Sequence, residues 1–174
     1  MDTLEAIAKR KSTRSYTSEQ LPEETLEKIL KAGCAAPVSM ANYESLHITV
    51  VQNPEMLQRI NHASEEALFQ MTGIRKNGDY GAQTLILLSS TPVHRPGAEY
   101  TNVGIIMENM VLAATALGVD SVMLGAAPVA ISRDKKFMKE LGIPEGYTPL
   151  LGAAFGYGAE ETPVKTHTIG INRV

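Results

Sequence analysis

The chain has no tryptophan, one cysteine, three phenylalanines and no long uninterrupted apolar run among its 174 residues. A single cysteine excludes an intramolecular disulfide, and Cys34 is expected to be a small buried apolar residue rather than a nucleophile. The most apolar stretch, residues 103–119, contains Glu108 and Asn109, so it is too short and too polar to span a bilayer. The N-terminus carries acidic residues and lacks the apolar segment of a signal peptide. We therefore expect a cytoplasmic protein.

An excess of positive charge is also missing. The chain carries 16 Lys and Arg against 19 Asp and Glu, a net charge of −3, which argues against nucleic-acid binding. Hydrophobic residues make up 44% of the chain, which fits a globular core built mainly from aliphatic side chains and methionine. A chain of this length is expected to fold as a single domain over residues 1–174 and to bury about 70% of its extended-chain surface.

The common catalytic motifs are absent as well. There is no phosphate-binding Gly-x-x-x-x-Gly-Lys-Ser/Thr and no Gly-x-Ser-x-Gly nucleophile motif. Glycines 152, 156 and 158 end an expected strand but open no helix, so they do not form a dinucleotide fingerprint. The four histidines, at positions 47, 62, 94 and 167, lack metal-ligand spacing, and no metal is expected. If the chain is an enzyme, a bound cofactor carries its chemistry.

Hydrophobic periodicity predicts two N-terminal helices followed by strands that alternate with helices. Asp2 is expected to cap the first helix, whose apolar face holds Leu4 and Ile7. A second helix is expected at residues 22–33, with Gly33 as its end, and a third begins at Asn53-Pro54. Two more are expected at 99–117, with Gly118 as the stop, and from a Ser132 cap to Gly142. The strands are expected at residues 46–51, 84–89, 119–124 and 149–155.

This order indicates an α+β or α/β sandwich. The tail after Pro163 is too polar to form a core of its own, and its weak alternation places Ile169 and Ile171 on one face. It is expected to be an extended arm that pairs with a sheet edge of another subunit, which would make the protein an obligate dimer.

The most informative stretch is the basic segment, residues 10–14, which reads Arg-Lys-Ser-Thr-Arg. Guanidinium groups match a phosphate bidentately, and hydroxyl and backbone N–H groups can complete such a site. On a mildly acidic chain, so compact a cationic cluster suggests one bound anion. Taken alone, it is more typical of a solvated basic loop at a helix end, where cations suit the helix dipole.

Five segments, in this order, resemble the nitroreductase family of FMN-dependent oxidoreductases: the basic segment, the Ala-Pro-Ser-rich residues 35–42, the helix 103–119, the stretch 141–157 with its Ile-Pro-Glu-Gly-Tyr and Gly-Tyr sequences, and Lys165. The resemblance spans essentially the whole chain. It implies an α+β fold with a central mixed, mostly antiparallel sheet flanked by helices. It also implies a homodimer with an exchanged C-terminal arm and two FMN sites at the subunit interface.

The resemblance further implies roles for individual residues. Arg10 and Ser12 would hold the FMN phosphate beside the backbone of Lys11, and Arg14 would reach the pyrimidine edge of the flavin. The ring bound by the other subunit would be contacted by Pro37, Val38, Ser39, Met40 and Asn42. The opposite side of the ring would be lined by Met123, Leu124 and Gly125, with the Gly125 N–H directed toward N5. Lys165 and His167 would lie near the phosphate. Residues 71–83 would add a ring contact, with Arg75 and Lys76 as candidates.

The implied activity is hydride transfer from NADH or NADPH through flavin N5 to a nitroaromatic, quinone or similar electrophile, in a ping-pong cycle. Departures from the family pattern, including Val38, Asn102 and Glu44-Ser45-Leu46, leave the substrate open. Three alternatives also stay open: a flavin-dependent dehydrogenase or deiodinase-like member whose partner delivers the electrons, a flavin-binding dimer without turnover, and a structural α/β module with a solvated basic segment.

Overall fold

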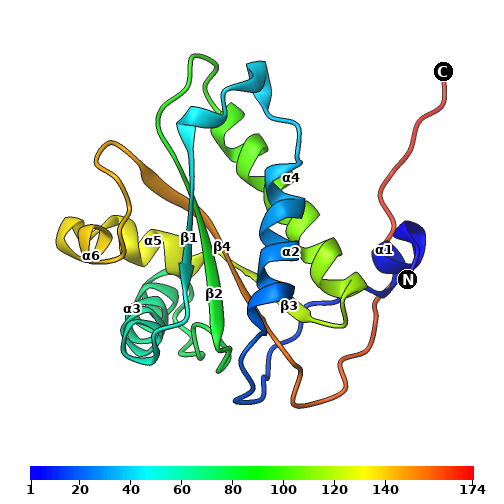
Figure 1. Ribbon diagram of the computed structural model, residues 1–174, viewed down its shortest axis with the longest axis horizontal. Helices are drawn as coiled ribbons and strands as arrows, with labels where there is room; N and C mark the ends of the chain where they lie inside the picture. Colours follow the sequence, from blue (N-terminus) through cyan, green and yellow to red (C-terminus); the bar gives the residue numbers. More distant parts are fainter.

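Four antiparallel strands form one sheet in the order β1-β2-β4-β3 in the computed structural model, which describes residues 1–174 (Figure 1). The strands are β1 (Leu46–Val51), β2 (Thr84–Ser90), β3 (Asp120–Leu124) and β4 (Thr148–Gly156). All seven residues of the central β2 are buried. The one parallel pairing is an isolated bridge between Ser12 and Ser121 at the β3 edge. The expected α+β class with a mostly antiparallel sheet is therefore confirmed.

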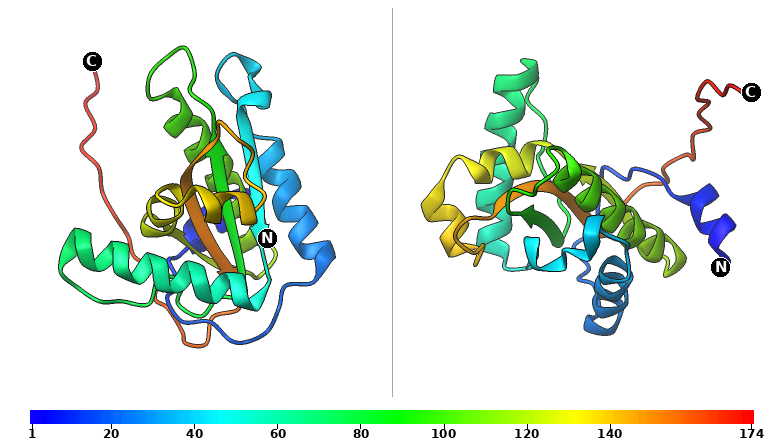
Figure 2. Two further views of the ribbon diagram at one scale, coloured as in Figure 1. Left: turned by 90° about the vertical axis from the view of Figure 1, so that its left-hand side faces the viewer. Right: turned by 90° about the horizontal axis from the view of Figure 1, so that it is seen from above.

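Helices cover both faces of the sheet (Figures 1 and 2). Along β2, Ile86 and Leu88 face a core made with α2 (Glu23–Cys34) and α4 (Ala98–Ala116). Leu85 and Leu87 face a second core made with α3 (Pro54–Thr72), α5 (Ala126–Ser132) and α6 (Lys135–Glu140). Successive side chains of a strand point to opposite faces, so one fully buried strand serves both cores.

Several helix ends lie where the sequence predicts them. The Asp2 carboxylate accepts a hydrogen bond from the Glu5 N–H at the start of α1 (Thr3–Lys9), and Asn53 caps α3 in the same way. Gly118 and Gly142 adopt positive φ angles of 77° and 71° just after α4 and α6, which glycine tolerates at no steric cost.

The expectation for Ser132 is wrong. Ser132 is the last residue of α5, a helix that the sequence pattern did not predict, and Asp134 caps the following α6 through the Phe137 N–H. The α5 sequence is only seven residues long, contains Pro128 and has no capping side chain, so it carries no strong local helix pattern.

Two expectations at the end of α2 are also wrong. The helix continues through Gly33 to Cys34, and Cys34 is exposed rather than buried. Gly33 is buried where α2 crosses α4, and a Cβ atom there would lie 2.8 Å from the Met110 Cγ. The glycine therefore allows close helix packing and does not end the helix.

The two ends of the chain leave the body on the same side (Figures 1 and 2). The tail after Gly158 forms no helix or strand, and Ile169 is 87% exposed. The predicted apolar face of α1 is likewise uncovered, with Leu4 78% exposed. No helix of the structure is both long and apolar enough to cross a membrane.

Candidate functional site

The basic segment runs alongside β3 in an extended conformation. Ser12 bridges Ser121, and the Thr13 N–H donates to the Ser121 carbonyl at 3.0 Å. Thr13 is 1% exposed, whereas Arg14 is exposed and Ser12 half-buried. Since side chains alternate along an extended chain, the inward Thr13 leaves Ser12 and Arg14 on the outer face.

The three cationic side chains of the basic segment differ in their interaction partners. Lys11 Nζ lies 3.6 Å from the Asp120 carboxylate. Arg14 donates to the Ser12 carbonyl at 3.3 Å, which holds its guanidinium close to the segment. The Arg10 side chain makes no hydrogen bond or ion pair. Arg10 is therefore the free cation of the cluster, and Lys11 is already partly neutralised.

Tyr16 closes the inner side of this region. Burial raises the pKa of its phenol, and the nearby Asp120 carboxylate raises it further. The Tyr16 and Thr13 hydroxyls are both buried without a hydrogen-bond partner. Tyr16 therefore stays neutral and offers no proton exchange at ordinary pH.

The other end of β3 carries the second group of predicted residues. Leu124 is buried, while Met123 and Gly125 are exposed. No atom lies within 4 Å of the position that a Cβ of Gly125 would take, so a ligand can approach the main chain there. Ser121 and Leu124 belong to the same short strand and are about 10 Å apart at 3.4 Å per residue. One elongated ligand could thus contact both groups.

The loop 37–42 lies toward the opposite end of α2 from the basic segment (Figure 1). The 12 residues of α2 correspond to a length of about 18 Å. A single chain therefore does not bring Pro37, Val38, Ser39, Met40 and Asn42 to Arg10. This separation is compatible with a loop that serves a second subunit.

The loop 37–42 has an unusual backbone. Met40 and Ala41, in the first 3-10 turn (Ser39–Ala41), have positive φ angles of 56° and 52°, which are uncommon for residues with a side chain. The turn is held by Asn102 of α4, whose Oδ1 accepts a hydrogen bond from the Ser39 N–H at 3.0 Å. Met40 is 86% exposed as a result.

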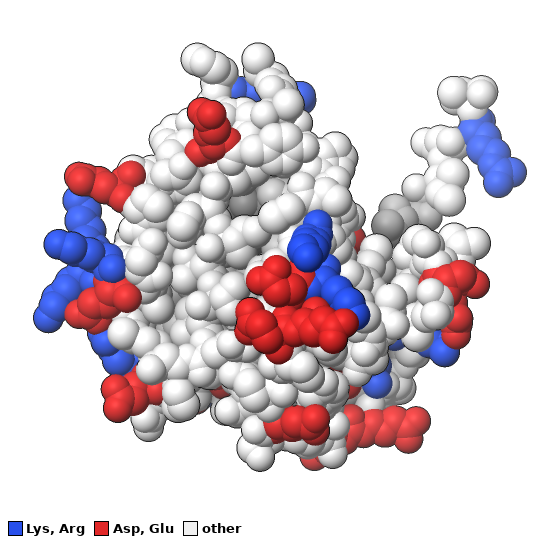
Figure 3. Space-filling model, viewed as in Figure 1, with Lys and Arg blue, Asp and Glu red and all other residues white.

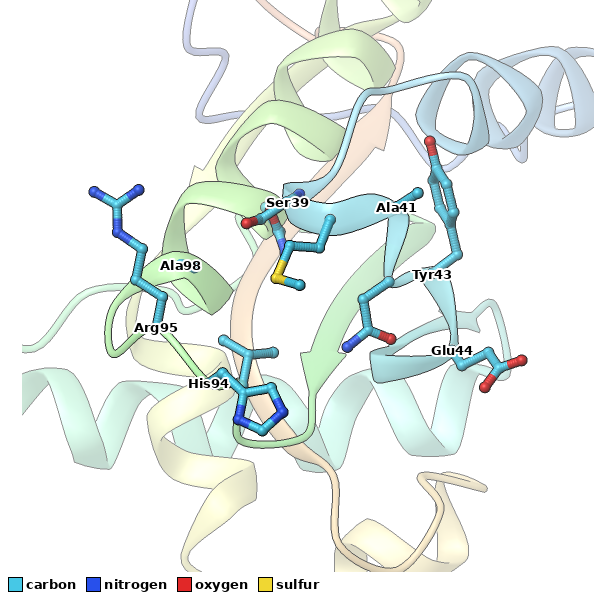
Figure 4. A pocket seen from close by; sticks show the side chains of 11 residues that line it. Ser39, Ala41, Tyr43, Glu44, His94, Arg95 and Ala98 are labelled. Carbon is cyan, nitrogen blue, oxygen red and sulfur yellow. The ribbon is translucent and has the colours of Figure 1, made fainter.

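A pocket of about 540 Å³ opens between this loop and the connection from β2 to α4 (Figure 4). The sequence indicated no role for residues 93–95, which form the wall opposite the loop 37–42, and it marked Asn102 only as a departure from the family pattern. The pocket is lined by Ser39, Met40, Ala41, Asn42, Tyr43, Glu44, Val93, His94, Arg95, Ala98 and Asn102.

The remaining predicted residues are not gathered at the basic segment. Arg75 pairs with Glu66 at 3.4 Å and lies over the Phe69 ring, so it is directed at α3. Burial raises the pKa of Asp79 in the same connection. Lys76, Lys165 and His167 are exposed, and none makes a hydrogen bond or ion pair.

The surface charges are interspersed. On the face shown in Figure 3, Lys and Arg side chains stand among Asp and Glu side chains instead of forming one continuous basic area. The fold and site thus describe an α+β protein with a small free cationic site on a sheet edge and a separate pocket at the far end of α2.

Comparison with known proteins places this architecture in a family. The family model "Nitroreductase family" matches residues 7–157, and the chain belongs to the nitroreductase family. Two archaeal proteins, each with a name that describes an NADH dehydrogenase/NAD(P)H nitroreductase, are similar over 92% of this chain. The Methanothermobacter thermautotrophicus protein is 31% identical with 79% of its length covered, and the Archaeoglobus fulgidus protein is 32% identical with 87% covered.

Solved structures of nitroreductases have the same fold as this chain. A nitroreductase with bound FMN from Bacteroides fragilis superposes with a TM-score of 0.85 at 30% identity, covering 100% of this chain and 99% of its own. A nitroreductase with bound FMN from Desulfitobacterium hafniense gives a TM-score of 0.86 at 26% identity, with 99% and 100% covered.

Proposed function

We propose that this protein is an FMN-dependent oxidoreductase that passes hydride from NADH or NADPH to a small electrophile such as a nitroaromatic or a quinone in a ping-pong cycle. Its family membership and the FMN in the similar B. fragilis and D. hafniense structures support the cofactor. The observation that carries the proposal is the basic segment: an unpaired Arg10, the Ser12 hydroxyl and an outward Arg14 on a strand-like stretch fixed to β3.

The residues present fit FMN. Arg10 and Ser12 would hold the phosphate, because the Arg10 guanidinium has no competing protein partner. Gly125 would admit the flavin to its main chain, since the space where a Cβ would stand is open. Met123 and Leu124 would line the same end of β3. Lys11 would contribute its backbone, because its ammonium already lies near Asp120.

Bound FMN supplies the hydride carrier between the nicotinamide and the acceptor. The protein's own contribution is placement and electrostatics. Arg14, restrained by the Ser12 carbonyl, would present fixed positive charge at the pyrimidine edge, where negative charge develops. The neutral, buried Tyr16 would add packing and no proton. No side-chain acid or base is therefore assigned to the cycle.

The complete site is proposed to need two copies of the chain. The loop 37–42 lies away from the basic segment of its own chain, so Pro37, Val38, Ser39, Met40 and Asn42 would contact the ring bound by the other copy. The extended tail would bring Lys165 and His167 across the same interface. The exposed α1 face and tail are the apolar surfaces that such a homodimer would cover.

Purification followed by anaerobic mixing tests this function. We expect protein with the visible absorbance of FMN that is bleached within a catalytic time by NADH or NADPH and recolours on adding a quinone or a nitroaromatic. Bound FMN that neither nucleotide bleaches would favour a flavin-binding dimer or a member reduced by a protein partner. Colourless protein without FMN affinity would leave only a structural module.

A further inference from the structure

The pocket at the end of α2 presents a hydrogen-bond donor on its floor. Asn102 is 2% exposed and lines the pocket. A backbone N–H can only donate, so the Asn102 atom that meets the Ser39 N–H must be its carbonyl oxygen, Oδ1. The amide NH₂ group of Asn102 is thereby left to donate elsewhere. It makes no hydrogen bond within the protein, and it is not among the fully buried polar atoms.

The rim of the pocket adds positive charge. Arg95 makes no ion pair and no side-chain hydrogen bond, whereas Arg59, Arg75 and Arg133 each have a protein partner. His94 precedes it on the same wall. The pocket also borders the N-terminus of the 19-residue α4, where the helix dipole is positive.

Two carboxylates lie near this wall, and neither occupies the pocket's donors. Glu44 lines the opposite side, but in Figure 4 its carboxylate points away from the space between Ser39 and His94. Glu99 accepts a hydrogen bond from the Gly97 N–H and so stays at its own helix start. The Arg95 guanidinium also points away from this space in Figure 4, so the Asn102 amide is the unpartnered donor that lines the pocket and Arg95 is a free cation at its rim.

We propose that this pocket binds the anionic oxygen group, carboxylate or phosphate, of a small-molecule substrate, with Asn102 and Arg95 as specificity-determining residues. Asn102 donates from the floor, and the flexible Arg95 side chain, which no protein partner holds, turns inward to pair with the charge at the rim. The assignment of the ligand as a redox substrate rests on the proposed function, in which Ser39, Met40 and Asn42 on the same pocket face the flavin of the other copy. The anion comes either from the electron acceptor or from the 2′-phosphate of NADPH.

The test compares charged and neutral partners of matched shape on the FMN-loaded protein. The acceptors are 4-nitrobenzoate and 4-nitrobenzamide, and the donors are NADPH and NADH. Arg95→Gln removes the rim charge. Asn102→Asp, assayed at pH 8, keeps an oxygen for the Ser39 N–H but replaces the donor toward the pocket with negative charge. Arg133→Gln, on the other side of the sheet, is the matched control for net charge.

We expect the unaltered protein to prefer the charged member of one pair through a lower KM. Arg95→Gln should reduce that preference about three- to tenfold, the range of a single partly exposed charged contact. Asn102→Asp should reduce it at least as much, and Arg133→Gln should leave it unchanged. A loss in the acceptor pair identifies the acceptor as the source of the anion, and a loss in the nucleotide pair identifies NADPH. No preference, or an equal loss in Arg133→Gln, overturns the proposal.

A binding measurement separates this proposal from the proposed function. Calorimetric titration of the purified protein with benzoate and with benzamide needs no turnover and no reduction of flavin. Tighter binding of benzoate that Arg95→Gln and Asn102→Asp both weaken supports an anion pocket even in protein that neither nucleotide reduces. Indistinguishable titrations in a protein that does reduce acceptors would overturn the anion pocket while leaving the oxidoreductase function intact.

Discussion

At the scale of single residues, alternation along residues 10–14 sorts five adjacent side chains into different environments. Thr13 turns into the protein, Lys11 lies near Asp120, and Arg10 and Arg14 retain cationic groups that no carboxylate neutralises. A buried or neutralised cation contributes little to anion binding, so the two arginines carry the testable roles.

Replacing Arg10 with alanine should weaken FMN binding roughly ten- to a hundredfold, because a charge-assisted contact of about 1.5–3 kcal/mol is lost. Riboflavin, which has no phosphate, should bind almost as well to Arg10→Ala as to the unaltered protein. Fluorescence titration of both ligands measures this. Lys9→Ala, which removes a neighbouring charge already paired with Glu5, is the control. Equal losses for FMN and riboflavin would place Arg10 away from the phosphate.

Replacing Arg14 with alanine should lower the two-electron potential of bound FMN while weakening oxidised FMN only modestly. A cation near N1 and O2 interacts more strongly with the reduced, anionic ring, and only such a difference moves a redox equilibrium. Losing about 1.4 kcal/mol of that difference corresponds to about 30 mV. Arg14→Lys should recover part of the shift. An unchanged potential in an anaerobic dye titration would show that Arg14 does not face the ring.

At the scale of elements, the contact between α2 and α4 sets where both ends of α2 lie. Gly33 packs against Met110, and Asn109 donates a hydrogen bond to the Ala32 carbonyl at 3.1 Å. Asn102, further toward the start of α4, holds Ser39 just beyond α2. The same pair of helices therefore positions the loop 37–42 and one wall of the pocket.

Gly33→Ala should destabilise the fold despite the better helix propensity of alanine. The gain in propensity is about 0.5–1 kcal/mol, whereas forcing a methyl group against Met110 costs about 1–3 kcal/mol. Urea unfolding should show a net loss. In a Met110→Ala background, which makes room at this contact, the same Gly33→Ala change should become neutral or stabilising. An equal loss in both backgrounds would mean that Met110 is not what the added methyl meets.

At the scale of the whole molecule, both chain ends carry exposed apolar residues. Leu4 and Ile7 of α1 lie on the side of the molecule from which the tail with Ile169 and Ile171 also extends. Monomeric proteins seldom leave so much apolar surface uncovered on adjoining segments. We therefore expect a homodimer with a large interface of the obligate class.

Sedimentation of the unaltered protein should give a dimer at micromolar concentration. Ile169→Asp should raise the dissociation constant roughly a hundredfold or more, because each buried isoleucine contributes about 1.5–3 kcal/mol and a symmetric dimer buries two. Thr168→Asp, on the alternate face of the arm, adds the same charge and should have a smaller effect. A stable folded monomer that still binds FMN would refute this assembly.

The sequence by itself determined the features that depend on neighbours along the chain. The strand positions, the Asp2 and Asn53 caps, the Gly118 and Gly142 helix ends and the cationic character of residues 10–14 follow from local periodicity, hydrogen bonding and backbone preference. The roles implied for those residues toward FMN stay predictions. The short α5 was not predicted, because a helix of seven residues without a capping side chain has only a weak helical sequence pattern.

Only the tertiary structure decided the features that depend on contacts between distant segments. The sequence does not distinguish a glycine at a helix crossing from a glycine at a helix end. The packing of Met110 against Gly33 shows that this glycine lies at a crossing. Asn102 lies 63 residues from Ser39, and residues 93–95 form the facing wall of the same pocket. No local pattern encodes such pairs, because the packing of α2 and α4 on the sheet brings them together.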